Sequence, residues 1–238
     1  MKGETMVGGP RVVVALDFSD RKQLDEFVAK LDPGLCRLKV GKELFTTFGP
    51  AIVEQLQARG FEVFLDLKFH DIPNTTAQAV KAAAGLGVWM VNVHASGGRR
   101  MMEACREVLE QESHAPLLIA VTMLTSLSDE EIVEIGFPCS AQEMVGRLAV
   151  LAQSSGMDGV VCSAQEAPLL RRAHGEEFCL VTPGIRPAAA AADDQTRIVT
   201  PAQAITDGSS YLVVGRPITR ALNPLDALQQ IVKEVESV

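Results

Sequence analysis

Eight short runs of β-branched and other apolar residues recur along the chain, and each is followed by a segment whose apolar residues have helical spacing. The runs cover residues 12–16, 37–40, 62–68, 90–94, 117–123, 159–162, 179–182 and 211–214. A strict strand–helix alternation produces a parallel sheet with right-handed crossover connections. Eight such units favour closure, so we predict the α/β class and a single-domain (β/α)8 TIM barrel, with an open doubly wound sheet as the alternative.

Three of the expected helices carry a sequence signal at their start. Each has a hydroxyl residue followed three positions later by a glutamate or glutamine, which is the pattern of a capping box. The pairs are Ser140 with Glu143, Ser163 with Glu166, and Thr200 with Gln203. Pro201 supports the last of these starts, because proline is favoured at the first helical position.

The length of 238 residues suits one barrel domain, since such domains typically have about 250 residues. No linker, charge block or low-complexity tract divides the chain. We therefore predict a flexible N-terminal tail at residues 1–10 and one barrel domain at residues 11–238, which carries the activity.

Charge and cysteine usage exclude several classes of protein. The formal net charge of -8 argues against a general nucleic-acid or membrane-surface binder, because such proteins usually present a basic face. The five cysteines are scattered without a CxxC pair, which argues against a disulfide framework and a zinc site. The N-terminus has no apolar run of signal-peptide length. We therefore expect a cytoplasmic protein with reduced thiols.

Charged residues gather where strands of the expected barrel end. They are Asp17 after the first strand, Lys39 in the second, Asp66 and Lys68 at the end of the third, and Asp71 just beyond it. The active site of a β/α barrel lies at the carboxyl ends of its strands, and alternation makes Asp66 and Lys68 point the same way. A single aspartate at a strand end more often forms a structural ion pair. Two lysines and three aspartates in apolar strands instead indicate a preorganised charged site.

A glycine and an arginine, Gly215 and Arg216, follow the eighth strand. Glycine lets a backbone N–H approach an oxyanion, and the arginine guanidinium donates several hydrogen bonds in one plane. The loops after the seventh and eighth strands frequently bind phosphate in β/α barrels, so this position predicts a phosphate site.

The segment at residues 66–75, DLKFHDIPNT, resembles the signature of the orotidine 5'-phosphate decarboxylase family. The resemblance spans nearly the whole chain in order. It includes residues 14–17, 38–41, 93–95, 121–126, 182–186, 194–197 and 214–216. It implies a barrel that needs neither cofactor nor metal and that converts orotidine 5'-monophosphate (OMP) into uridine 5'-monophosphate (UMP) and CO2, the last step of de novo UMP synthesis.

The resemblance implies a role for each charged residue at the strand ends. Lys68 matches the proton donor to C6 of the pyrimidine, and Asp66 matches the aspartate beside the departing carboxylate. Lys39 and Asp17 match the residues that hold the ribose hydroxyls. The resemblance also implies an alternating Lys39-Asp66-Lys68-Asp71 network.

A homodimer with shared active sites is implied as well. In the family, the residues that match Asp71 and Thr75 reach across a dimer interface into the partner's site. Residues 187–194 match the loop that closes over the ligand.

Further matched residues contact the base and the phosphate. Thr125 matches the hydroxyl residue that contacts the pyrimidine ring, and Gln195 matches the glutamine that bridges base and phosphate. Gly215 and Arg216 match the residues that bind the phosphate, and Arg186 matches a further arginine on the phosphate side.

The implied chemistry needs a fixed cation. Loss of CO2 from C6 leaves a carbanion with no adjacent electron sink, so the barrier must be lowered by surrounding charge and prompt protonation. An ammonium group in a dry site does both, which suits Lys68.

Two other functions stay open. The related sugar-phosphate decarboxylase and hexulose-phosphate synthase group resembles this chain in its barrel and DxKxxD core but uses Mg2+. Residues 72–75, Thr125 and Gln195 favour a pyrimidine substrate instead. The second alternative is a non-catalytic barrel that binds a nucleotide, and the presence of both lysines and all three aspartates argues against it. We expect no nucleic-acid or membrane partner.

Overall fold

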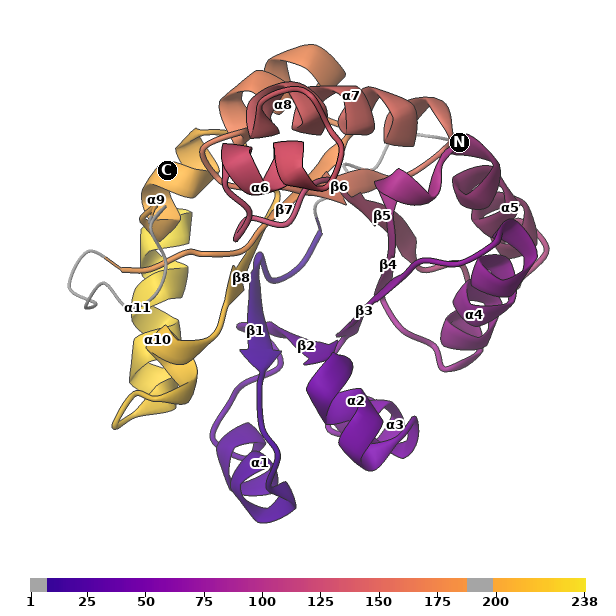
Figure 1. Cartoon of the computed structure of the whole chain (residues 1–238). Coiled ribbons are helices and arrows are strands. Elements are labelled where there is room, and N and C mark those ends of the chain that lie inside the picture. The colour runs from indigo at the N-terminus through magenta and orange to yellow at the C-terminus, as the bar shows by residue number, and fades with distance from the viewer. Residues whose placement is uncertain (1–7, 188–198) are drawn as a thin grey trace.

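The computed structural model describes residues 8–187 and 199–238, and its eight strands form one closed parallel barrel (Figure 1). In order around the barrel they are β1 (Val12–Leu16), β2 (Arg37–Gly41), β3 (Val63–Phe69), β4 (Met90–His94), β5 (Leu117–Val121), β6 (Gly159–Val161), β7 (Cys179–Thr182) and β8 (Tyr211–Val214). Pairing of β8 with β1 closes the ring. The predicted (β/α)8 barrel is confirmed, while residues 1–7 of the predicted tail lie outside the described residues.

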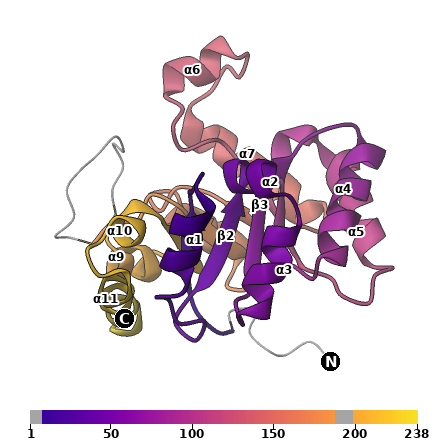
Figure 2. The ribbon, with the colours of Figure 1, turned by 90° about the horizontal axis from the view of Figure 1, so that it is seen from below.

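Helices surround the barrel on its outside (Figure 1). They are α1 (Arg21–Val28), α2 (Lys42–Phe48), α3 (Ala51–Ala58), α4 (Pro73–Gly85), the 3-10 helix η1 (Ala95–Gly97), α5 (Arg99–Leu109), α6 (Asp129–Glu134), α7 (Ala141–Ser154), α8 (Ala167–His174), α9 (Pro201–Thr206), α10 (Arg216–Thr219) and α11 (Pro224–Glu236). Figure 2 shows α6, which follows β5, standing away from the barrel and the other helices. None of these described helices is both long and apolar enough to cross a membrane.

The strands bury apolar side chains on both faces. In β1, Val12 and Val14 belong to the large core between barrel and helices, whereas Val13 belongs to a smaller core inside the barrel. This is the two-residue period of a strand. Because both faces are covered, strands such as β1 and β5 read as continuous apolar runs, and the other strands are predominantly apolar, which is why the runs could be recognised in the sequence.

Side chains from six strands fill the inside of the barrel. They are Val13, Phe64, Met90, Ile119, Cys179, Val181 and Tyr211. A Cβ built on Gly159 of β6 would lie 2.1 Å from the Cys179 carbonyl oxygen, so only glycine fits at that position. The barrel interior is therefore a packed core and not a pore.

Arg37 closes the amino-terminal end of the barrel. Its guanidinium carbon lies 4.0 Å from the centroid of the Trp89 ring and 5.2 Å from that of Tyr211. The guanidinium also pairs with Glu62 (Nε–Oε2, 2.7 Å) and donates to the Gly8 carbonyl oxygen (2.6 Å). Cation–π contacts and the ion pair compensate the burial of this cation.

Two of the three predicted helix starts are confirmed. Ser140 and Thr200 cap α7 and α9, and each hydroxyl accepts a hydrogen bond from the backbone N–H three residues on, at 3.3 Å. The third prediction, at Ser163, is wrong. The Ser163 N–H donates to the Glu166 carboxylate (2.8 Å), but the chain forms a turn there and α8 begins only at Ala167.

Candidate active site

A chain of ion pairs lies toward the carboxyl ends of β2 and β3. Lys39 Nζ is 3.4 Å from Asp66 Oδ2, and Lys68 Nζ is 2.5 Å from Asp66 Oδ1. The neighbours Leu38 and Leu65 pack in the core outside the barrel, so alternation turns Lys39 and Asp66 inward. The structure brings together both lysines and two of the three aspartates that the sequence singled out, Asp66 and, at the rim of the site, Asp17.

The central carboxylate of this chain is almost removed from solvent. Asp66 is 8% exposed and Lys39 is 9% exposed. Each charge would cost several kcal/mol to bury without a partner. Asp66 Oδ1 also accepts a hydrogen bond from Asn92 Nδ2 at 2.7 Å. Because donors hold the carboxylate on both oxygens, the site is preorganised before any ligand arrives.

Asp17 extends the chain of charges to the rim of the site. Its Oδ1 lies 3.8 Å from Lys39 Nζ, and its side chain is 65% exposed. An ion pair this exposed contributes little to stability, so the Asp17 carboxylate is accessible to a ligand.

Lys68 has an unusual backbone conformation. Its φ of 51° makes it the one non-glycine residue with positive φ in the described part of the chain. Such a conformation costs on the order of 1–3 kcal/mol and persists only where the surroundings enforce it. The pairing of β3 with β4 shifts register between Leu65 and Phe69, and the Lys68 N–H donates to Asn92 Oδ1 (2.8 Å). The irregularity re-aims a side chain, as bulges beside active sites do.

A cavity of about 120 Å³ opens beside these charges. Its lining consists of Lys39, Phe64, Asp66, Lys68, Val121, Met123, Leu124, Thr125, Val161, Val181, Pro183 and Val213. Three charged side chains and the Thr125 hydroxyl are set among apolar walls. Such walls keep the local dielectric constant low and strengthen the field of the charges.

A second cavity, of about 200 Å³, adjoins the first and shares Lys39, Pro183 and Val213 with it. Its polar lining consists of Asp17, Lys39, Arg186, Gly215 and Arg216. Two guanidinium groups and an ammonium make the cavity cationic overall. The arrangement suits an anion with several acceptor oxygens, such as a phosphate.

Asp71 and Thr75 lie apart from this cluster. Both are exposed, and neither lines the two cavities. Asp71 Oδ1 accepts a hydrogen bond from the Ile72 N–H (2.7 Å), and Ile72 is 67% exposed. Within the described residues of one chain, the expected network runs from Lys39 through Asp66 to Lys68. The contribution of Asp71, expected from a partner subunit, stays a prediction. Gln195 and residues 188–194 of the expected closing loop lie outside the described residues.

His94, at the end of β4, is neutral at pH 7. Burial, followed by the positive field of His70, Lys42 and Lys68, lowers the pKa of His94 to about 4. Its ring centroid is 5.5 Å from that of His70. A neutral imidazole here leaves Lys39 and Lys68 as the cations beside Asp66.

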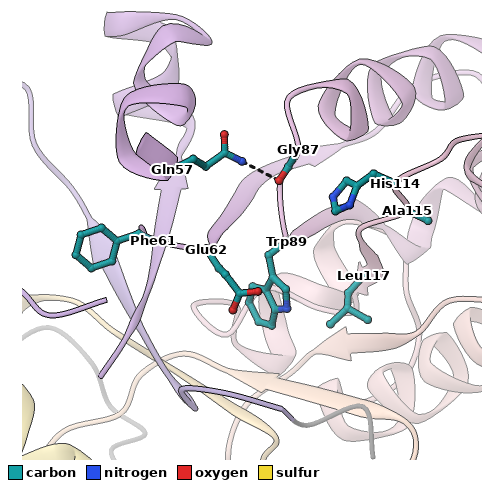
Figure 3. A pocket seen from close by; sticks show the side chains of 8 residues that line it. All are labelled: Gln57, Phe61, Glu62, Gly87, Trp89, His114, Ala115 and Leu117. Atoms are coloured by element: carbon teal, nitrogen blue, oxygen red, sulfur yellow. Dashed lines mark hydrogen bonds between the residues drawn. The ribbon is translucent and has the colours of Figure 1, made fainter. Parts of the chain in front are cut away.

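A larger cavity, of about 310 Å³, lies at the other end of the barrel (Figure 3). Its lining consists of Gln57, Phe61, Glu62, Gly87, Trp89, His114, Ala115 and Leu117, mostly at or just before the starts of β3, β4 and β5. The Gln57 amide donates to the Gly87 carbonyl oxygen at 2.7 Å, as the dashed line shows. Residues at this end of a β/α barrel serve stability, so the larger cavity is not the active site.

Sequence reasoning missed Asn92. It is fully buried and bonds both Asp66 and Lys68. The signal was present, because an asparagine in an apolar strand must find hydrogen-bond partners inside the protein.

Comparisons with known proteins agree with this geometry. Residues 10–231 match the Orotidine 5'-phosphate decarboxylase / HUMPS family. The chain is 63% identical over 226 residues to the orotidine 5'-phosphate decarboxylase of Saccharophagus degradans, covering 95% of each protein. It is 61% identical over 234 residues to that of Chromobacterium violaceum, covering 98% of this chain and 94% of the relative. The crystal structure of orotidine 5'-phosphate decarboxylase from Lactobacillus acidophilus matches with a TM-score of 0.84 and 41% identity, over 96% of this chain and 99% of that one. The chain therefore belongs to the orotidine 5'-phosphate decarboxylase / HUMPS family.

Proposed function

We propose that the chain decarboxylates OMP to UMP and CO2, the last step of de novo UMP synthesis. The observation that carries this proposal is the Lys39-Asp66-Lys68 chain of ion pairs, which lines an apolar-walled cavity beside a cationic one. Relatives at 63% and 61% identity over nearly the whole chain are named for this reaction.

The two cavities match the two ends of the substrate. The pyrimidine ring occupies the smaller cavity, with the Thr125 hydroxyl at its edge and Lys68 facing C6. The ribose lies where the cavities meet, because Lys39 lines both of them. Lys39 and Asp17, 3.8 Å apart, hold the ribose hydroxyls.

The phosphate occupies the larger of these two cavities. Arg186 and Arg216 donate to its oxygens, and Gly215 allows a close approach of the backbone. The family resemblance assigns the bridge between base and phosphate to Gln195, which lies outside the described residues. Holding the phosphate away from the reacting carbon lets remote binding energy order the charges around C6.

The chemical step breaks one bond and forms one. The C6–carboxylate bond breaks, CO2 leaves, and the bonding electron pair stays on C6. The Lys68 ammonium stabilises that pair by its charge and then transfers a proton from Nζ to C6, giving UMP. Neutral Lys68 regains a proton from solvent after product release.

Asp66 has two tasks in this scheme. It holds both ammonium groups, at 3.4 Å for Lys39 and 2.5 Å for Lys68. It also lies beside the departing carboxylate of the substrate. Because Asp66 is buried, it imposes these positions without the reorganisation that water would require.

The enzyme acts as a homodimer in which Asp71 and Thr75 of each subunit complete the partner's site and extend the charge network there. Both residues are exposed after the carboxyl end of β3, beside the exposed Ile72 side chain. Their exposure makes both side chains accessible to a second subunit.

The enzyme works in the cytoplasm. All five cysteines, Cys36, Cys105, Cys139, Cys162 and Cys179, are free thiols. Free, mostly buried thiols are usual in a reducing compartment.

One assay tests the proposed function. Purified, EDTA-treated protein is incubated with OMP, and the loss of OMP ultraviolet absorbance is followed. Turnover that survives chelation supports the proposal. The family description also includes the HUMPS group, which the sequence suggested as a Mg2+-dependent alternative. Turnover that requires added Mg2+, or binding of OMP without turnover, would refute the proposal.

A further inference from the structure

We infer that Asn92 is a positioning residue for the Lys68–Asp66 pair, an inference that rests on the proposed function. Its side chain connects the two residues: Oδ1 accepts the Lys68 N–H at 2.8 Å, and Nδ2 donates to Asp66 Oδ1 at 2.7 Å. Asn92 is 0% exposed, so no water replaces these hydrogen bonds if the amide is removed.

The amide group has the chemistry that this position requires. A backbone N–H needs an acceptor and a carboxylate needs a donor, and a short primary amide supplies both from one side chain. The donor is neutral, so Asn92 fixes Asp66 without adding charge to the field of the lysines. A leucine of similar size would leave both the Lys68 N–H and one Asp66 lone pair without their partner.

The hydrogen bond from the Lys68 N–H to Asn92 is important because the Lys68 backbone is strained. A lysine does not adopt a φ of 51° without support, and the register shift removes regular pairing with β4 around it. The hydrogen bond to Asn92 takes the place of a ladder bond and holds the strained N–H. Released from it, the Lys68 backbone relaxes toward an ordinary strand, and its ammonium moves away from C6.

In the part of the chain that the structure describes, four ionisable groups lie next to Asn92 or next to its hydrogen-bond partners. They are Asp66 and Lys68 on β3, Lys39 on β2 behind Asp66, and His94 two residues along β4. Its partner in β5, Ile119, is apolar. A new carboxyl group at position 92 would therefore be affected most by Asp66, which lies within hydrogen-bond distance.

The first test compares two variants that each remove a buried acceptor of a backbone N–H. Asn92→Leu removes the anchor of Lys68. Ser210→Ala is the matched control, because the Ser210 hydroxyl accepts the Leu180 N–H (3.0 Å), is 2% exposed and lies before β8, at the other end of the barrel. We expect Asn92→Leu to lower kcat about 100-fold, as misplacement by about 1 Å does, with little change in KM or UMP binding. Ser210→Ala keeps kcat and loses only thermal stability.

The second test uses Asn92→Asp, which separates positioning from packing. When protonated, the new carboxyl donates to Asp66 and accepts the Lys68 N–H, as the amide does. When ionised, it repels Asp66 and lacks the donor. We expect kcat relative to wild type to be highest at acidic pH and to fall as pH rises, whereas Asn92→Leu stays low at every pH.

The outcomes are distinguishable. If wild type turns over OMP and Asn92→Leu keeps its kcat, the positioning role is wrong and the proposed function stands. If the wild-type protein does not turn over OMP, both the proposed function and the positioning role of Asn92 are wrong. Should Asn92→Leu not fold, Asn92→Asp decides: acid-dependent recovery supports the role, and a profile parallel to wild type overturns it.

Discussion

Replacing Lys39 with methionine tests whether the buried charges of the site stabilise the fold by compensating one another. Methionine keeps the apolar stem and removes the ammonium. At 3.4 Å and an effective dielectric constant of about 20, the Lys39–Asp66 attraction is about 5 kcal/mol. Part of it is offset, because the variant no longer has to desolvate an ammonium. Asp66 also keeps Lys68 at 2.5 Å. We therefore expect a net loss of about 2 kcal/mol, less than the ~3–5 kcal/mol of a buried charge left alone.

Thermal unfolding at neutral pH measures this loss. For a domain of this size, about 2 kcal/mol corresponds to a fall in Tm of about 4–8 °C. Lys22→Met is the control, because the Lys22–Glu26 pair is 3.8 Å apart with side chains 85% and 61% exposed, and should contribute less than about 0.5 kcal/mol.

A double-mutant cycle of Lys39→Met with Asp66→Asn then isolates the pairwise energy. The compensation argument predicts a coupling of at least about 1 kcal/mol. A Lys39→Met protein as stable as wild type, together with zero coupling in the cycle, would refute the reasoning.

Three further predictions concern turnover and pH. Lys68→Ala removes both the proton donor and a cation, so it should reduce kcat by more than about 10⁴-fold in a single-turnover assay, while calorimetry should still show UMP binding. A near-normal kcat would contradict the role of Lys68 as proton donor. Asp71→Ala and Lys68→Ala should each be inactive alone, but a 1:1 mixture should recover about a quarter of wild-type activity. Half of the dimers are then mixed, and each mixed dimer has one intact site out of two. No recovery despite confirmed subunit exchange would contradict shared sites. The pKa of His94 is about 4 in the folded protein, against an ordinary value of 6.5. Between these two pH values the unfolded state binds a proton at His94 and the folded state does not, so the free energy of unfolding should fall as pH drops from about 6.5 to 4. His94→Gln should make this decline shallower in urea titrations, and identical slopes for both proteins would rule the contribution out.

The barrel was predictable from the sequence because its strands are buried on both faces. All five residues of β1 are buried, so the strand stands out as an apolar run. The strand ends were harder to place. β5 ends at Val121, two residues before the predicted end, yet Thr122 and Met123 are still buried. A hydrophobic pattern reports burial, and backbone pairing can stop before burial does.

The candidate site could be predicted only in part. Lys39 and Asp66 stood out because charges are rare in apolar strands, and alternation was enough to turn both inward. The conformation of Lys68 was not predictable from its own neighbourhood, because it depends on Asn92, 24 positions along the chain. The place of Asp71 depends on a second subunit in our proposal, and a hydrophobic pattern within one chain carries no such information.

The contact of Arg37 with Trp89 and Tyr211 at the amino-terminal end of the barrel has a practical consequence for spectroscopy. Trp89 and Tyr211 are the only tryptophan and the only tyrosine in the sequence, and their rings meet edge to face with centroids 4.9 Å apart. Both aromatic side chains thus report from the amino-terminal end of the barrel, and neither lines the two cavities of the candidate active site. Emission from this protein follows global unfolding, and a ligand titration needs another probe.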